Sequence, residues 1–169
     1  MGNKWILRKI RKEDCMDISE AFKKQGWDKP VAQYQKYVEF QEEGKRGVIV
    51  AEVNGEFAGY LTIKWESEYL PFKEKKIPEV VDFNVLMKFQ RKGIGTALMN
   101  EAERRIGKVS NYSGIGFGVY KDYGAAQILY VNRHYVPDGN GLVKNFKTLE
   151  YGEEVIVNDD LAFYLIKRL

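Results

Sequence analysis

Cysteine and histidine are nearly absent from this chain, which has one of each, Cys15 and His134, among its 169 residues. A single cysteine excludes an intramolecular disulfide, and this pair cannot supply the usual ligands of a structural zinc site. A reducing compartment and no metal are therefore expected. Long apolar runs are lacking too, since near the start only Trp5, Ile6 and Leu7 stand together before charged residues return. The sequence predicts a cytoplasmic protein without a membrane partner.

An excess of one charge is also missing. The chain has 27 Lys and Arg against 24 Asp and Glu, a formal net charge of +3, and the two signs are interspersed. No cationic stripe that could follow a phosphate backbone stands out, so nucleic acid is not expected as a partner. A length of 169 residues suits a single domain spanning 1–169, which can bury roughly 68–70% of the surface of its unfolded chain.

The first half of the chain predicts a strand, two helices and a hairpin. Residues 5–10 indicate a short strand, and apolar residues recur at helical spacing from Cys15. A second amphipathic helix is expected over 31–44. Apolar runs on both sides of Asn54-Gly55 predict an antiparallel hairpin, because this pair supplies the positive φ values of a type I′ turn.

The second half predicts alternating strands and helices. Residues 66–78 contain two prolines without a sustained period and are expected to form a loop. A strand over 78–87 leads into a helix with apolar residues spaced helically from 94 to 106, followed by a strand at about 115–120 and another helix. This order favours parallel pairing beside the antiparallel hairpin. A segment rich in Gly, Asn and acidic residues, 138–160, precedes a final strand.

The stretch between the strand over 78–87 and the helix after it reads QRKGIGT, residues 90–96. Its two glycines let the backbone approach a ligand closely, and the free N–H groups of a new helix favour phosphate oxygens. Arg91 and Lys92 add positive charge. A P-loop or a dinucleotide fingerprint fits poorly, because the first needs Gly-Lys-Ser/Thr and the second needs three spaced glycines. The remaining alternative is a glycine-containing helix start that binds no ligand.

This stretch resembles the pyrophosphate-binding motif of the GNAT superfamily of N-acetyltransferases, a Gln/Arg-x-x-Gly-x-Gly/Ala run between a strand and a helix. The resemblance extends over nearly the whole chain, through the early strand and helices, the Asn-Gly hairpin, the motif, and the later strand and helix. It implies an α/β fold with a mixed sheet. That sheet would be mostly antiparallel, with a splayed parallel pair of strands in the middle and helices flanking it.

The resemblance also implies acetyl-CoA as co-substrate. The motif's backbone N–H groups would hold its pyrophosphate, and its pantetheine would lie along the strand edge at 83–87. A backbone N–H near Leu86 would then polarise the thioester carbonyl. The residues expected to bind acetyl-CoA are Val85, Leu86, Gln90, Arg91, Lys92, Gly93, Ile94, Gly95 and Thr96.

Acetyl transfer to an amine needs a base and benefits from an acid, because the attacking amine must be neutral and a thiolate leaves. Tyr130 matches the tyrosine of the family and is the candidate acid, with core packing as its alternative. Glu79 matches a family carboxylate and is the candidate base, with Asp82 or water as rivals. Positions three apart in a regular strand face opposite sides, so at most one of these carboxylates faces the cleft unless a bulge intervenes.

Two positions depart from the family pattern. His134 stands where relatives often have glycine and is expected to be a turn or packing residue, with a contact to the CoA 3′-phosphate or adenine as the lesser alternative. Tyr123 stands where many relatives have asparagine, which questions the usual hydrogen bond to pantetheine. Neither change removes a residue that the chemistry requires.

The sequence therefore predicts an N-acetyltransferase that moves acetyl from acetyl-CoA directly to a primary amine of a small molecule or peptide. The alternative is a non-catalytic acyl-CoA-binding or sensing domain of the same fold. A homodimer is compatible with the resemblance, because the family often forms one. The acceptor is not identified, and specificity is expected to reside in the early helices and in 66–78 and 138–160.

Overall fold

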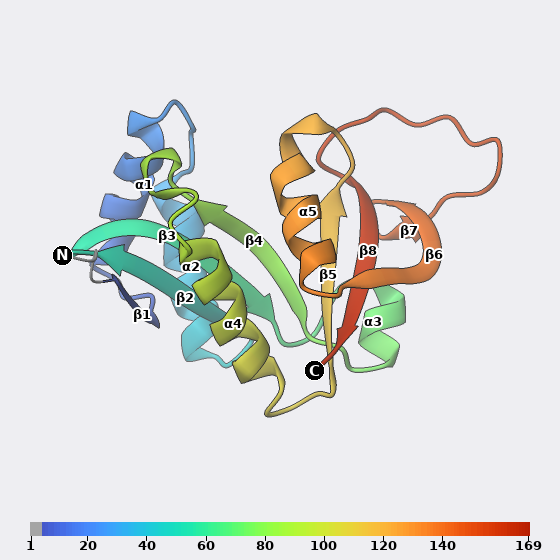
Figure 1. Ribbon diagram of the computed structural model, residues 1–169, viewed down its shortest axis with the longest axis horizontal. Helices are drawn as coiled ribbons and strands as arrows, with labels where there is room; N and C mark the ends of the chain where they lie inside the picture. Colours follow the sequence, from blue (N-terminus) through green and yellow to red (C-terminus); the bar gives the residue numbers. More distant parts are fainter. Residues whose placement is uncertain (1–4) are drawn as a thin grey trace. The chain divides into compact units, whose positions relative to one another are not determined.

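A computed structural model of the protein describes residues 5–169 (Figure 1). The described residues group into two compact units. The first comprises the described residues up to Trp65 together with Val81–Arg105, and the second comprises Glu66–Val80 and Ile106–Leu169. Strand β4 (Glu79–Val85) begins in the second unit and continues in the first.

The sheet of the first unit has β1 (Trp5–Lys9), β2 (Arg46–Val53) and β3 (Glu56–Lys64), with β4 beside β3. The pairs β1–β2 and β2–β3 are antiparallel. The turn between β2 and β3 confirms the predicted hairpin, since Asn54 and Gly55 have φ values of 52° and 84°.

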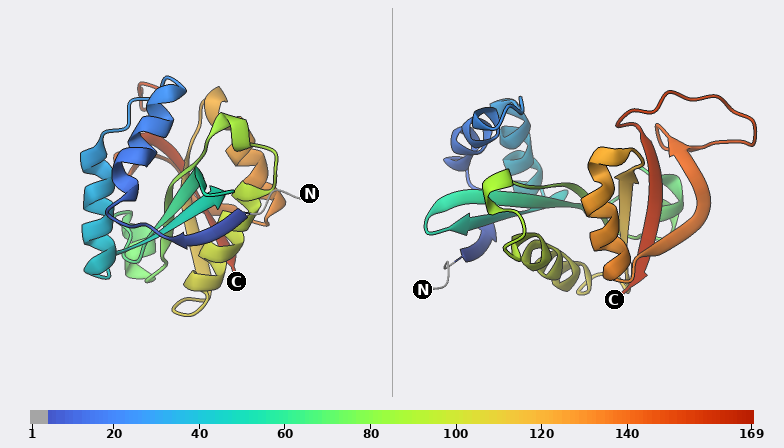
Figure 2. Two further views of the ribbon diagram at one scale, coloured as in Figure 1. Left: turned by 90° about the vertical axis from the view of Figure 1, so that its left-hand side faces the viewer. Right: turned by 45° about the horizontal axis from the view of Figure 1, so that its top comes forward.

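The helices of the first unit are α1 (Asp14–Lys24), α2 (Val31–Glu42) and α4 (Ile94–Ile106), with a single 3₁₀ turn, η1 (Met87–Phe89), before α4. Figure 2 shows α1 and α2 over one face of the β2–β3 sheet and α4 over the other. All three helices were predicted, because each carries a stripe of buried apolar residues. The stripe of α1, for example, consists of Cys15, Ile18 and Phe22.

The second unit contains β5 (Tyr112–Gly118), β8 (Leu161–Arg168), β6 (Val136–Lys144) and β7 (Lys147–Thr148), in that order from β4. β4 and β5 pair in parallel at two positions, and the other pairs in this unit are antiparallel. The predicted class, an α/β fold with a mixed sheet and one parallel pair among antiparallel strands, is therefore confirmed.

Two helices flank this sheet: α3 (Leu70–Glu74) and α5 (Gly124–Asn132), the latter preceded by a 3₁₀ turn, η2 (Lys121–Tyr123). They lie on opposite faces of β5 and β8 (Figures 1 and 2). On the α3 side, one core cluster is built from Tyr69, Phe72, Ile77, Val143 and Tyr164.

Two sequence expectations need correction, and one segment without a predicted element contains strands. The segment 66–78 is not wholly a loop, because it contains α3. Pro71 lies in the first turn of that helix, where its missing N–H costs nothing. The segment 138–160 contains most of β6 and all of β7, hidden from periodicity by a register shift between Pro137 and Leu142. Strand β5 runs from Tyr112 to Gly118, so it begins three residues and ends two residues earlier than predicted.

Candidate active site

The loop between η1 and α4 has a backbone suited to an anion. Arg91 and Gly93 adopt left-handed φ values of 58° and 81° on either side of Lys92, and all three are exposed. Alternation of this kind brings backbone N–H groups together in a concave surface that binds anions. The first turn of α4 lacks acidic residues, so its unpaired N–H groups face no competing carboxylate from that turn.

The structure requires glycine at the two motif positions for different reasons. Gly93 needs its left-handed backbone, and a Cβ there would meet nothing within 4 Å. Gly95 has no such φ, but a Cβ there would lie 3.2 Å from the ring of Phe83. Gly95 therefore lets α4 pack closely on β4, while Gly93 leaves open space over the loop.

The end of β4 narrows the choice of an N–H near Leu86 for the thioester carbonyl. The N–H of Leu86 donates to the carbonyl of Ala58 on β3 at 2.9 Å, so this amide is already used within the first unit. Successive amides of a strand point to opposite edges, which directs the N–H of Val85 away from β3. The side chain of Gln90 reaches back and donates to the Val85 carbonyl at 3.1 Å.

The backbone of β4 is irregular at Asp82, whose φ of 52° is typical of a bulged residue. The rule that positions three apart in a strand face opposite sides therefore does not hold for Glu79 and Asp82. A bulge was the exception to this rule that the sequence left open. On the neighbouring strand, a Cβ at Gly59 would lie 2.6 Å from the carbonyl oxygen of Asn84. Glycine is needed there because β3 approaches the bulged strand so closely.

The carboxylate of Asp82 is the centre of a polar network in the first unit. Five side chains donate to its oxygens or pair with them, and they come from the loop after α1, from α2, from β3 and from β4. They are Tyr60 at 2.5 Å, Tyr37 at 2.7 Å, Asn84 at 2.7 Å, Gln33 at 3.0 Å and Lys29 at 3.4 Å. Burial, and then the charge of Asp82, raises the pKa of Tyr60 and of Tyr37 well above the ordinary tyrosine value. Sequence reasoning missed these partners, because no spacing links residues so far apart.

Glu79 belongs to the second unit, at the first parallel pairing of β4 with Gly114 of β5. Its side chain is buried, with 5% of the residue exposed, and the Ser67 hydroxyl donates to it at 2.5 Å. Burial, and then the charge of Glu79, raises the pKa of Tyr164. Glu79 is thus a buried carboxylate beside aromatic side chains rather than a solvated residue at a strand end.

Tyr130 also belongs to the second unit, on α5, with 6% of the residue exposed. Its ring lies 6.3 Å from that of Phe117 and 6.2 Å from that of Tyr135. Among the described residues its hydroxyl has no hydrogen-bond partner, and burial raises its pKa above the ordinary value. Tyr130 therefore stays protonated at neutral pH and keeps an uncommitted donor.

The two departures from the family pattern have structural roles. His134 follows α5 with a left-handed φ of 67°, and its N–H donates to the carbonyl of Val131 at 2.9 Å. It ends the helix as a turn residue, which confirms the expectation for this position. The hydroxyl of Tyr123 donates to Asp159 at 3.0 Å, which connects η2 to the segment before β8.

Comparison with known proteins identifies the family. The profile of the acetyltransferase (GNAT) family matches residues 12–135, more than half of the chain. The chain belongs to the GNAT acetyltransferase family. This confirms the resemblance and makes the protein an acetyltransferase. It is 33% identical over 121 residues to an N-alpha-acetyltransferase of Sulfurisphaera tokodaii, a match covering 63% of this chain and 71% of that relative.

Solved structures support the fold of the acetyltransferase. An N-acetyltransferase from Staphylococcus aureus Mu50 superposes with a TM-score of 0.70 at 14% identity, covering 98% of both chains. A ribosomal-protein-alanine N-acetyltransferase from Brucella melitensis has a TM-score of 0.68 at 16% identity, covering 97% of this chain and 99% of the other. At these identities the likeness concerns the fold alone.

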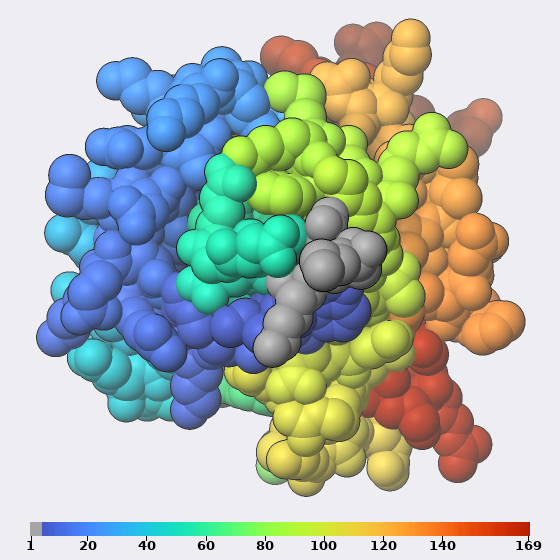
Figure 3. Space-filling model, turned by 60° about the vertical axis from the view of Figure 1, so that its left-hand side comes forward, coloured from blue at the N-terminus to red at the C-terminus, as the bar shows by residue number. Residues whose placement is uncertain are grey.

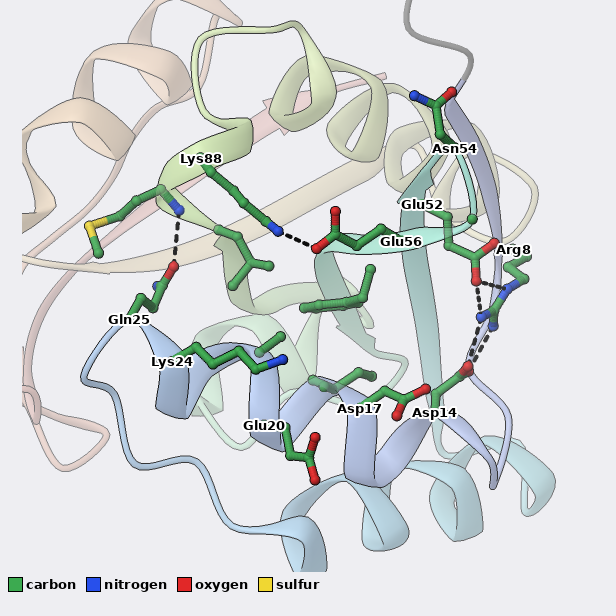
Figure 4. Close-up of a pocket in the computed structure, with 16 residues that line it drawn as sticks. Arg8, Asp14, Asp17, Glu20, Lys24, Gln25, Glu52, Asn54, Glu56 and Lys88 are labelled. Carbon is green, nitrogen blue, oxygen red and sulfur yellow. Dashed lines mark hydrogen bonds and ion pairs between the residues drawn. The ribbon is translucent and has the colours of Figure 1, made fainter.

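A pocket of about 680 Å³ opens in the first unit of the acetyltransferase, among α1, the β2–β3 turn and the segment 86–88 (Figure 4). Figure 3 shows the same face, with α1 in blue on one side of the teal β2–β3 turn. Many of its charges pair with each other: Arg8 bonds to Asp14 at 2.7 Å and to Glu52, and Lys88 pairs with Glu56.

This pocket does not suit the phosphates of CoA. Its lining has five carboxylates against three basic side chains, and neither Tyr130 nor Glu79 lines it. The N–H of Met87 at its edge is already bonded to the side chain of Gln25 at 3.1 Å. The loop over 90–96 therefore remains the better phosphate site of the first unit.

Among residues 5–169, no group of three or more His, Cys, Asp or Glu side chains could hold a metal ion. Within the same described range, no helix is both long and apolar enough to cross a bilayer.

Proposed function

We propose that residues 1–169 act as a single N-acetyltransferase domain that moves acetyl from acetyl-CoA directly to a primary amine of a small molecule or peptide. The observation that carries this proposal is the loop before α4. Left-handed residues at Arg91 and Gly93, open space above Gly93 and a helix start without acids fit a pyrophosphate. Acetyl-CoA supplies the activated acetyl thioester.

The binding residues act through the backbone and positive charge. Amides from Arg91 to Thr96 bind the pyrophosphate, and the side chains of Arg91 and Lys92 add charge that draws it in. The N–H of Val85, directed away from β3, replaces that of Leu86 as the donor to the thioester carbonyl. Gln90 holds the adjacent carbonyl and so keeps this end of β4 in place.

Two side chains of the second unit handle protons. Glu79 accepts the proton that the amine loses, and Tyr130 donates its uncommitted hydroxyl proton to the leaving thiolate. Asp82 is the weaker candidate for the base. Five donors already surround its two oxygens, so taking a proton would require one of them to leave.

The proposal is tested by calorimetric titration of acetyl-CoA into the folded protein, with CoA as competitor. We expect micromolar binding, followed by thiol release when a panel of amines is added with acetyl-CoA. Binding without turnover on any amine would favour the non-catalytic acyl-CoA-binding alternative. No binding at millimolar acetyl-CoA would exclude both functions and leave the glycine loop with a structural role.

A further inference from the structure

Three groups in the first unit surround the Nζ atom of Lys29 and favour a positive charge there. The nitrogen lies 3.4 Å from a carboxylate oxygen of Asp82 and 3.3 Å from the hydroxyl of Tyr60. It also lies 5.1 Å from the ring centre of Phe22 and 5.8 Å from that of Tyr60, within the range of cation–π attraction. We call Phe22, Tyr60 and Asp82 the ammonium cradle.

Lys29 is held loosely in this cradle. Its distances of 3.3 and 3.4 Å exceed the 2.7–2.9 Å usual for charge-assisted hydrogen bonds. Tyr60 and Tyr37 approach the same carboxylate much more closely, at 2.5 and 2.7 Å. The side chains of Lys29 and Asp82 are 20% and 19% exposed, whereas Phe22 and Tyr60 are buried, so water reaches the cradle on the side of the carboxylate.

The backbone of Lys29 is fixed independently of its side chain. The hydroxyl of Ser19 on α1 donates to the Lys29 carbonyl at 2.6 Å, and Pro30 follows with its restricted φ. The ammonium group can therefore leave the cradle by side-chain rotation while the chain stays in place. An external ammonium with better geometry can then enter.

We propose that the ammonium cradle docks a second primary ammonium group of the acceptor, and that Lys29 is a built-in competitor which the acceptor displaces. This rests on the proposed acetyl transfer to amines. A carboxylate and two aromatic faces stabilise the protonated form, so a group bound there stays charged and cannot be the attacking nitrogen. The acceptor class is then a primary amine that carries another primary ammonium, as a diamine or a lysine-containing peptide does.

The cradle itself is tested without acetyl transfer. Lys29→Ala vacates it, and n-butylammonium chloride, which has the length of the lysine side chain, is added during thermal unfolding. We expect a saturable rise in Tm larger than that of the wild type or of Lys36→Ala, an exposed lysine on α2, with sodium chloride matching the ionic strength. Adding Asp82→Asn should abolish the rise. If that variant does not fold, adding Tyr60→Phe, which removes the hydroxyl but keeps an aromatic ring, should reduce it.

An equal response of Lys29→Ala and Lys36→Ala would overturn the cradle, whatever the enzymatic activity. The docking role is tested by comparing 1,5-diaminopentane with n-pentylamine as acceptors. We expect a higher kcat/KM for the diamine, rising a further 2- to 5-fold or so in Lys29→Ala because a weakly paired competitor is gone. Equal kcat/KM for both acceptors would overturn docking while leaving amine acetylation intact.

Discussion

The glycine at position 93 offers a direct test of the phosphate loop, because a matched glycine exists elsewhere in the same unit. Gly93 has a φ of 81° and Gly44, after α2, has a φ of 71°, and a Cβ at either would meet nothing within 4 Å. Valine at either position must therefore adopt the same left-handed backbone, and its Cβ meets no other atom there. Only the substitution at 93 places a side chain over the loop.

The two substitutions should cost similar stability. A side chain forced into the left-handed region costs roughly 1–2 kcal/mol, which for a domain of this size lowers Tm by about 2–8 °C. Acetyl-CoA binding should separate them. Losing one amide contact to a phosphate costs roughly 1.5–3 kcal/mol, or about a 10- to 140-fold rise in Kd.

We would measure Tm and the calorimetric Kd of acetyl-CoA for Gly93→Val and Gly44→Val. The expected result is a comparable loss of Tm in both, with a weaker Kd only in Gly93→Val. If Gly93→Val bound acetyl-CoA as tightly as Gly44→Val at the same loss of stability, the loop would not contact the phosphates. The reasoning from the left-handed residues would then be refuted.

The remaining predictions concern proton transfer and stability. Tyr130→Phe should lower kcat at least about 100-fold with unchanged Tm and acetyl-CoA Kd, because its hydroxyl has no partner among the described residues. Tyr135→Phe, which removes a 2.8 Å hydrogen bond, should instead cost about 1 kcal/mol of stability and keep kcat. Glu79→Gln should remove the acidic limb of the pH profile of kcat, and an unchanged profile would assign the base to water or another carboxylate. Hydrogen bonding from Arg104 lowers the pKa of Glu101 to about 2, so its stabilisation is complete above about pH 4.5 and fades as the pH falls through 2. Glu101→Gln should therefore cost about 1 kcal/mol in denaturant unfolding at pH 7, and this cost should shrink as the pH falls from about 4.5 through 2.

Elements with one clear local cause could be predicted from the sequence. The Asn54-Gly55 turn requires positive φ values that few other pairs tolerate, and α1 and α4 carry apolar stripes at helical spacing. Elements whose cause lies in tertiary packing were missed. The five-residue helix α3 is too short to show a period and forms because Phe72 packs against Tyr69 and Tyr164.

The candidate site likewise has one part that the sequence predicts and one part that it does not. The glycine loop is contiguous in sequence, so its residue types alone indicated phosphate binding. The Asp82 network is not, because Lys29, 53 residues away, meets the carboxylate only after α1, β3 and β4 have assembled. One sequence signal did exist. Gly59 interrupts an apolar strand, and an isolated glycine there indicates a bulge or a close backbone approach. The sequence does not show which strand pairs with β3, so the backbone that approaches Gly59 could not be assigned to β4. The irregular backbone at Asp82 was hidden for the same reason, and Glu79 and Asp82 were expected to alternate as in a regular strand.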